Sequence, residues 1–208
     1  GKTPGSADDL AAPGLLARYV TGHLETVKAL LAAGERGDLP LFNMPQGAMA
    51  RCIAEQAAGG ELHHDSPVGV GTALDVRTGG HGGRIANWRD QKEFDDCFIR
   101  PSPGRGALLR FALPRITVAM MNARFCDADG NVYFCSNGTV TESIDAARAA
   151  RRNGGKVFVC VQRVISAAPP RVDEQMMLPA SEVDGICVLT GGIDERLLRE
   201  ARTDQWID

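Results

Sequence analysis

The chain has 208 residues, of which 44% are hydrophobic and 24% charged, and its formal net charge is −3 at pH 7. This composition is typical of a globular protein, and the mildly acidic balance argues against nucleic-acid binding, which requires a basic surface. No apolar run approaches the roughly 20 residues that span a bilayer, so we expect no membrane segment.

Six cysteines are dispersed along the chain without a Cys-x-x-Cys pair: Cys52, Cys97, Cys126, Cys135, Cys160 and Cys187. Several lie in apolar contexts, where a free cysteine behaves as a small hydrophobic residue. Residues 1–12 contain no apolar segment of the kind found in secretion signals, and we expect them to be a flexible N-terminal segment. Reduced thiols in a cytoplasmic protein are therefore favoured over the disulfide bonds of a secreted one.

The first part of the chain predicts alternating strands and helices. Residues 14–20 predict a strand, and leucine and valine then recur at helical spacing until Gly34. The apolar run 39–43 predicts a second strand, and a second helix extends from Gln46 to the glycines at 59–60. Its buried face is expected to carry Met49, Cys52, Ile53 and Ala57. This order predicts a parallel sheet covered by helices.

The middle of the chain is less regular. Residues 79–106 are rich in glycine, proline and charges, and we expect a mobile loop that becomes protected when a ligand or partner binds. Residues 107–112 and 116–122 predict strands. Residues 127–131 predict a turn, from which 132–135 return as a strand.

The last third predicts one more helix between strands. Thr139 and Glu142 have the spacing of a capping box. The apolar side of the following helix comprises Val140, Ile144, Ala147 and Ala150. The unbroken apolar run 156–161 predicts a strand buried on both faces. Residues 183–189 predict a final strand, and residues 191–208 a C-terminal helix or linker.

Two segments carry the strongest functional signal. Asn43-Met-Pro-Gln-Gly47 joins the second strand to the second helix, where unpaired N–H groups and the positive end of the helix dipole suit a carboxylate, a thioester oxygen or a phosphate. The second is the glycine-rich turn between Gly69 and Gly80, where backbone can approach a ligand closely. Neither segment is diagnostic alone, but their order and spacing are.

Together these segments resemble family I coenzyme A transferases, in the branch of the propionate CoA-transferases. Members of this branch carry Tyr-Asn-Leu-Pro-Gln-Gly and then Val-Gly-Leu-Gly-Thr-Phe-Val-Asp-Pro-Arg. The corresponding stretches here are Leu41-Phe-Asn-Met-Pro-Gln-Gly47 and Val68-Gly-Val-Gly-Thr-Ala-Leu-Asp-Val-Arg77. The resemblance continues at Thr21-Gly-His23 and in residues 154–164, and covers 13–190 in family order.

The resemblance implies a three-layer α/β half-domain with a largely parallel sheet, over residues 13–190. It also implies transfer of CoA from an acyl-CoA to a carboxylate, with CoA as a substrate and no permanently bound cofactor. The attacking glutamate of the family lies in the second half, whereas this chain matches the first and lacks that half's opening strand and glycine turn. We therefore expect an α-type subunit, a fragment or an incomplete homologue. It should need a β-type partner half, form an oligomer, and be inactive alone.

The resemblance assigns no catalytic residue to this chain, but it implies a substrate- and CoA-binding wall. Its members are His23, Asn43, Gln46, Gly47, Gly69, Gly71 and Thr72. Gln46 would donate a hydrogen bond to the acyl oxygen or the acceptor carboxylate without adding charge. From the residues alone, Gln46 is also compatible with a plain helix start, Asn43 with a helix N-cap, and the glycines with a tight turn. His23 is either a pocket-lining residue or a packed or hydrogen-bonded histidine.

Other polar residues have weaker functional readings. Arg77 and Arg84 lie near the glycine cluster, where they either meet CoA phosphates or are solvated loop charges. His63, His64 and Asp65 are the types of residue that bind metal ions. Adjacent ligands rarely share one tetrahedral site, however, and we expect no metal here. Two rival functions remain: a non-catalytic binding or assembly subunit that retains the fold, and a sugar-phosphate isomerase of the same wider fold group.

Overall fold

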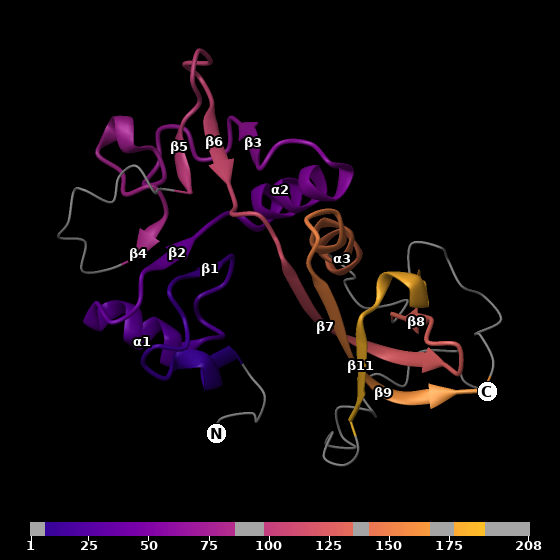
Figure 1. Ribbon diagram of the computed structural model, residues 1–208. Helices are drawn as coiled ribbons and strands as arrows, with labels where there is room; N and C mark the ends of the chain where they lie inside the picture. Colours follow the sequence, from indigo (N-terminus) through magenta and orange to yellow (C-terminus); the bar gives the residue numbers. More distant parts are fainter. Residues whose placement is uncertain (1–6, 86–97, 135–141, 167–176, 190–208) are drawn as a thin grey trace, which may run out of the picture. The chain divides into compact units, whose positions relative to one another are not determined.

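The computed structural model describes residues 7–85, 98–134, 142–166 and 177–189 (Figure 1). The chain divides into two compact units, one within Gly1–Cys52 and Leu62–Leu113, the other within Ile53–Glu61 and Pro114–Asp208. No helix in the described part of the chain is long and apolar enough to cross a membrane. The predicted α/β class is confirmed, although the described strands form three sheets that are partly parallel. The predicted boundaries at 12 and 190 stay a prediction.

The first sheet of unit 1 has the order β1-β2-β4. Its strands are β1 (Tyr19–Thr21), β2 (Leu41–Asn43) and β4 (Arg84–Ile85). β1 and β2 pair in parallel, from Tyr19 opposite Leu41 to Thr21 opposite Asn43, and β4 pairs antiparallel with β2. The strand predicted over 14–20 is therefore confirmed at its end, and the parallel β-α-β step is present as predicted.

Helix α1 (Lys28–Arg36) connects β1 to β2. Its first turn is held by Asp8 in the short helix η1 (Ala7–Ala11), whose Oδ1 accepts from the N–H of Ala29 at 2.9 Å. The helix passes through Gly34, where we expected it to end, and stops at Gly37 in the left-handed conformation (φ 82°). Gly34 instead allows Leu41 to pack closely against the helix, because a Cβ at position 34 would lie 2.7 Å from Leu41 Cδ2.

Helix α2 (Gln46–Ala58) begins directly after Pro45, whose carbonyl accepts from the N–H groups of Ala48 and Met49 at 2.9 and 3.0 Å. Asn43 ends β2 and lies outside the helix, so the alternative reading of Asn43 as N-cap is wrong. Of the residues expected on the buried face, Cys52 is fully buried, and Met49, Ile53 and Ala57 are partly buried.

The second sheet of unit 1 has the order β3-β6-β5, with antiparallel pairing throughout. Its strands are β3 (His63–Ser66), β5 (Ile99–Pro101) and β6 (Leu109–Ala112). Leu109 and Phe111 are fully buried in a cluster that also contains Phe42 and Met44. Thus β6 is confirmed. In contrast, β4 and β5 lie in the region that we expected to be a loop, because strands this short show no periodicity; residues 86–97 are outside the described part.

Unit 2 contains a five-stranded sheet in the order β10-β8-β7-β9-β11. Its elements are β7 (Val118–Asp127), β8 (Val132–Tyr133), α3 (Ser143–Arg152), β9 (Lys156–Ile165), β10 (Met177–Leu178), η5 (Ala180–Glu182) and β11 (Gly185–Val188). β7, β9 and β11 run parallel to one another, and the pairs β7–β8 and β8–β10 are antiparallel. The predicted strands and the helix are therefore present, with β7 and β9 longer than expected.

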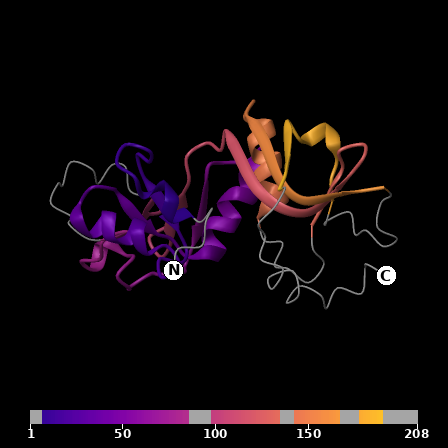
Figure 2. The same ribbon diagram turned by 90° about the horizontal axis from the view of Figure 1, so that it is seen from below.

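One face of this sheet packs against α3 (Figure 2). Val157, Val159 and Val161 alternate along β9 and are buried together with Ala147 of α3. On the opposite face of β9, Phe158 is 42% exposed. The prediction that β9 is buried on both faces is wrong for the described residues, because the apolar run 156–161 supplies hydrophobic side chains to both faces but helix α3 covers one.

The helix start in unit 2 also differs from the prediction. α3 begins at Ser143, and Glu142 occupies the N-cap position without a side-chain hydrogen bond to the helix. A capping box would have placed Glu142 in the first turn, so that prediction is wrong; Thr139 and Val140 lie outside the described residues. Ile144, Ala147 and Ala150 are buried, as expected.

The predicted turn at 127–131 is confirmed and is built around Asp127. Its carboxylate accepts from the N–H groups of Asp129 and Asn131, from Asn131 Nδ2, and from the hydroxyl of Tyr133 at 2.7 Å. Burial tends to raise the pKa of Asp127, but the hydrogen bonds from Asn131 and Tyr133 outweigh it and lower the pKa. Burial and the bond to Asp127 raise the pKa of Tyr133 to about 12.

Candidate functional site

The candidate site lies where β1 and β2 end, in unit 1. Because the two strands are parallel, both carboxyl ends reach the same edge of the sheet. The parallel pairing continues to the residue after β2, since the N–H of Met44 donates to the carbonyl of Thr21 at 3.0 Å. This step brings the segment after β1 alongside the first residues of α2.

His23 and Gln46 meet at this edge. The Nε2 atom of the His23 ring lies 3.0 Å from Oε1 of Gln46. Since a carboxamide oxygen accepts, the imidazole is the donor, carrying its proton on Nε2. Gly22 permits the approach, because a Cβ at that position would lie 3.1 Å from the Cβ of Gln46.

Because Oε1 of Gln46 faces His23, the N–H donors of the Gln46 amide point away from His23. Gln46 is exposed, and among the described residues its amide nitrogen makes no hydrogen bond. Gln46 is also the first residue of α2, where backbone N–H groups are unpaired and the helix dipole is positive. The arrangement therefore offers neutral donors to an anionic or partly negative oxygen.

Asn43 and Gly47 belong to the same junction. The N–H of Asn43 donates to the carbonyl of Gly83 at 2.6 Å, which ties the end of β2 to the segment before β4. Gly83 has a positive φ of 80°, and a Cβ there would collide with the carbonyl oxygen of Asn43. Gly47 is exposed in the first turn of α2, with open space where a side chain would project.

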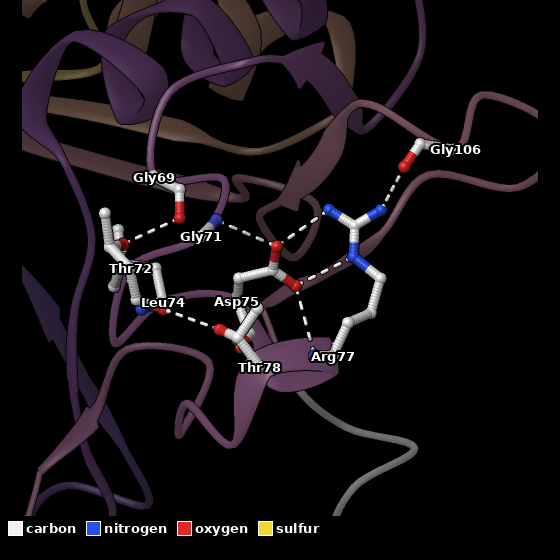
Figure 3. A network of polar contacts seen from close by, with 8 residues as sticks. All are labelled: Gly69, Gly71, Thr72, Leu74, Asp75, Arg77, Thr78 and Gly106. Carbon is white, nitrogen blue, oxygen red and sulfur yellow. Dashed lines mark hydrogen bonds and ion pairs between the residues drawn. The ribbon is translucent and has the colours of Figure 1, made fainter.

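The glycine-rich turn closes on a buried carboxylate, Asp75 (Figure 3). Asp75 is 2% exposed, and its Oδ2 accepts from the N–H of Gly71 at 3.0 Å. The hydroxyl of Thr72 donates to the carbonyl of Gly69 at 2.6 Å. The N–H of Gly71 and the hydroxyl of Thr72 thus hold the turn in a fixed shape and are already used inside it.

Arg77 completes this network. Its Nε and Nη2 atoms donate to the two carboxylate oxygens of Asp75, each at 2.8 Å, and Nη1 donates to the carbonyl of Gly106. The bonds from Arg77 and from the Gly71 N–H hold the pKa of Asp75 well below its usual range. Because its guanidinium is occupied in this way, the structure does not support Arg77 as a phosphate ligand.

Arg84 is also engaged, since its guanidinium lies over the ring of Phe42, 5.6 Å from the centroid. The metal reading of His63, His64 and Asp65 fails on similar grounds. Asp65 accepts from Arg110 Nε at 2.8 Å and from the hydroxyl of Ser102 at 2.7 Å, and Arg110 is the main reason that its pKa is strongly lowered. Within the described ranges, no group of three or more His, Cys, Asp or Glu residues is arranged to hold a metal ion.

The predicted site residues therefore fall into two groups. His23, Asn43, Gln46 and Gly47 share the junction of β1, β2 and α2. Gly69, Gly71 and Thr72 form the separate turn, connected to the junction through Leu74, which packs against the cluster containing Phe42 and Met44. Sequence reasoning missed Asp75. The available signal was its position in the stretch Val68–Arg77, where it matches the aspartate of the family stretch.

The chemistry of the junction is that of binding and orientation. Among the described residues, no carboxylate or thiol is hydrogen-bonded or ion-paired to the side chain of His23 or Gln46, and the Cys52 thiol is buried and donates to the carbonyl of Phe111. The described part of the junction offers donors to an oxygen-rich group.

Comparison with known proteins yields no matching family model. Curated relatives include acetate CoA-transferase YdiF of Escherichia coli K12, 24% identical over 162 residues, which are 76% of this chain and 29% of the relative. Caffeate CoA-transferase of Acetobacterium woodii is 25% identical over 185 residues, which are 87% of this chain and 33% of the relative. The chain thus spans about a third of the length of the curated relatives it matches.

Solved structures share the fold. The acyl-CoA transferase YdiF of E. coli O157:H7, as a thioester complex with CoA, superposes with a TM-score of 0.73 at 23% identity over 88% of this chain and 36% of its own. Glutaconate coenzyme A-transferase of Acidaminococcus fermentans gives 0.60 at 18% identity, over 87% of this chain and 57% of its own. A variant of the decarboxylase AibA/AibB gives a TM-score of 0.56 at 20% identity, over 94% of this chain and 71% of its own. These findings confirm the resemblance to family I coenzyme A transferases and their α/β fold.

Proposed function

We propose that this chain is the first, α-type part of a CoA-transferase that moves CoA from an acyl-CoA to a free carboxylate. The observation that carries the proposal is the contact of His23 with Gln46 at the start of α2, in a chain with the fold of these transferases. In this reading the junction of β1, β2 and α2 is one wall of the acyl site.

Gln46 acts on the oxygen of the reacting carbonyl. His23 holds Oε1, so the amide N–H groups face the substrate, where they donate to the thioester oxygen as negative charge develops. A neutral donor suits this reaction, because a cation at the same place would pair with the acceptor carboxylate and weaken it as a nucleophile. The positive end of α2 adds to the same stabilisation.

The nucleophile comes from a partner half. A glutamate carboxylate there attacks the thioester carbon, expels the CoA thiolate and forms an acyl–glutamyl anhydride. The thiolate then attacks the glutamyl carbonyl carbon of the anhydride, releasing the donor acyl group as a free carboxylate and leaving a glutamyl-CoA thioester. The acceptor carboxylate reverses these steps, takes up the CoA and regenerates the glutamate. Two observations support a partner half: no described carboxylate is hydrogen-bonded or ion-paired to the side chain of His23 or Gln46, and the chain spans 29% and 33% of its curated relatives.

The glycine turn serves as a rigid second wall in this reading. With Asp75 and Arg77 closing it from inside, Gly69, Gly71 and Thr72 present a surface of fixed shape that borders the CoA or acyl group. CoA enters as a substrate. Holding both carboxylates and the thiolate in one arrangement is the main contribution of such walls to the rate.

A binding or assembly subunit without catalysis is the alternative, and the fold alone does not decide between reactions, since the decarboxylase AibA/AibB shares it. The test is exchange of CoA between acyl-CoA and isotopically labelled carboxylates, measured by mass spectrometry on the chain alone and with the polypeptide that supplies the second half. We expect exchange in the combined sample and none with the chain alone. Failure of the combined sample over a panel of short acyl groups would favour the alternative.

A further inference from the structure

Cys160 on β9 and Cys187 on β11 are directly opposite each other in the sheet of unit 2. Neighbouring strands lie about 4.7–4.9 Å apart, which is within the Cα separation of about 4.4–6.8 Å found in disulfide bonds. Directly paired residues also point to the same face of a sheet. The two thiols therefore lie next to each other on one face of the sheet.

The pair lies on the face of the sheet opposite to the core. Val159 and Val161, on either side of Cys160, are buried in the core, and alternation along the strand places Cys160 on the other face. Cys160 is half-buried and Cys187 is exposed, whereas Cys52 and Cys126 are buried. A small solute can therefore reach the first pair but not the other two thiols.

We propose that Cys160 and Cys187 are a site of reversible thiol–disulfide exchange, at which a small-molecule disulfide such as oxidised glutathione links strand β11 to β9. The proposal is independent of CoA transfer, because neither thiol belongs to the junction of β1, β2 and α2.

The exchange takes two balanced steps. The Cys187 thiol gives its proton to solvent, and the thiolate attacks one sulfur of oxidised glutathione, breaking its S–S bond and releasing one glutathione thiolate. The Cys160 thiolate then attacks the Cys187 sulfur of this mixed disulfide and releases the second glutathione. Two protein thiols are oxidised, and one glutathione disulfide is reduced to two thiols, which take up the two protons.

Exposure sets this order. Cys187 is the accessible thiol, whereas burial and the neighbouring Cys187 raise the pKa of Cys160, which leaves less thiolate there for the first attack. Once the mixed disulfide has formed, Cys160 lies directly opposite Cys187, whose sulfur it must attack. The bond fastens an edge strand, because β9 is the sheet neighbour of β11 on one side and the described sheet ends at β11 on the other.

The experiment treats the 208-residue chain with oxidised glutathione, blocks remaining thiols by alkylation and digests with trypsin. Cleavage after Lys156, Arg163, Arg171 and Arg196 separates the two cysteines into peptides 157–163 and 172–196, each with a single cysteine. We expect these two peptides to be recovered as one disulfide-linked species that a reducing agent separates. In Cys160→Ser, Cys187 should instead accumulate as the glutathione adduct, because the second thiol is absent.

Recovery of the wild-type peptides unlinked, with both thiols alkylated or with a lasting glutathione adduct on Cys187, would overturn the proposal. The wild-type result decides the question even if a variant folds poorly, because the linked peptide reports the bond directly. Hydrogen exchange gives a second readout, in which the amides of 185–188 should exchange more slowly after oxidation. Unchanged exchange there would contradict the fastening of β11.

Discussion

His23 and Gln46 are 23 positions apart in the chain and are joined by a 3.0 Å hydrogen bond at the common end of two parallel strands. The bond fixes which end of the Gln46 carboxamide faces outward. If this orientation matters for the reaction, then His23 is a positioning residue whose effect depends on Gln46.

Removing His23 should therefore reduce activity without abolishing it. In the complete enzyme we expect His23→Ala to lower kcat/KM by between about 2-fold and 10-fold, the range of a single neutral hydrogen bond. His23→Gln keeps an N–H donor and should recover part of the loss. Combined with Gln46→Ala, the His23→Ala change should add little, because the group that it orients is gone. Full additivity of the two changes would show that His23 acts independently.

The buried ion pairs predict acid sensitivity of unit 1. Arg77 and Arg110 hold the pKa values of Asp75 and Asp65 below the usual range, so their contribution to stability is present above the unfolded carboxyl pKa of about 3.9 and is lost as the pH falls toward the folded values. Asp75→Asn should be less stable than wild type at pH 7, and this difference in stability should become smaller below a pH of about 4. Urea midpoints at pH 7, 4 and 3 measure this.

A matched control is available at the surface. Asp38 pairs with Arg36 where both side chains are more than half exposed, 55% and 61%. Such exposed pairs contribute little, so Asp38→Asn should leave the urea midpoint nearly unchanged over the same pH range. If the difference in urea midpoint between Asp75→Asn and wild type stays constant with pH, the network stabilises unit 1 through packing and not through the charge of Asp75.

Gln56 predicts a stability effect confined to unit 2. This buried side chain on α2 accepts from the Ile116 N–H at 2.9 Å and from Asn153 Nδ2 at 3.3 Å, and donates to the Pro114 carbonyl at 3.1 Å. Gln56→Leu keeps the bulk but leaves these groups unpaired, at a cost of about 1–3 kcal/mol of unfolding free energy. Arg51→Ala, at an exposed position of the same helix, is the control. Equal midpoints for both variants in chemical denaturation would contradict the role of Gln56.

Gly83 predicts a local requirement for glycine beside the site. Gly83→Ala combines a positive φ with a collision against the Asn43 carbonyl, whereas Gly104, with φ +69°, has open space around a built Cβ. Both substitutions cost about 1–2 kcal/mol for the left-handed conformation, and Gly83→Ala should cost more because of the contact. Thermal unfolding of the two variants separates the effects. If Gly83→Ala lowers the Tm no more than Gly104→Ala does, the backbone near Asn43 can move to relieve the collision.

The sequence predicted the alternating elements around the candidate site because their patterns are local. The step from β2 into α2 is marked by an apolar run, a proline and a helical repeat, and Asn43 and Gln46 lie where these signals place them. The direct contact of His23 with Gln46 was not predicted as a pair, although two parallel strands necessarily bring their following residues together.

The wrong or missed predictions concern residues whose place is decided by neighbours that the local sequence pattern does not reveal. Gly34 resembles a helix stop but lies inside α1 because Leu41 packs against it. Strand β5 has three residues, too few for a pattern, and is held by pairing with β6. Asp75 resembles a loop carboxylate until Gly71 and Arg77 fold around it.

The most direct test of the account is the kinetics of Gln46→Ala in the complete enzyme, compared with the nearby exposed variant Arg51→Ala. If the Gln46 amide donates to the reacting oxygen, kcat/KM should fall by about 10²–10³-fold, with the Tm unchanged because the side chain is exposed. Arg51→Ala should retain wild-type kinetics. A Gln46→Ala enzyme with wild-type kcat/KM would contradict the account and leave Gln46 as no more than the first residue of a helix.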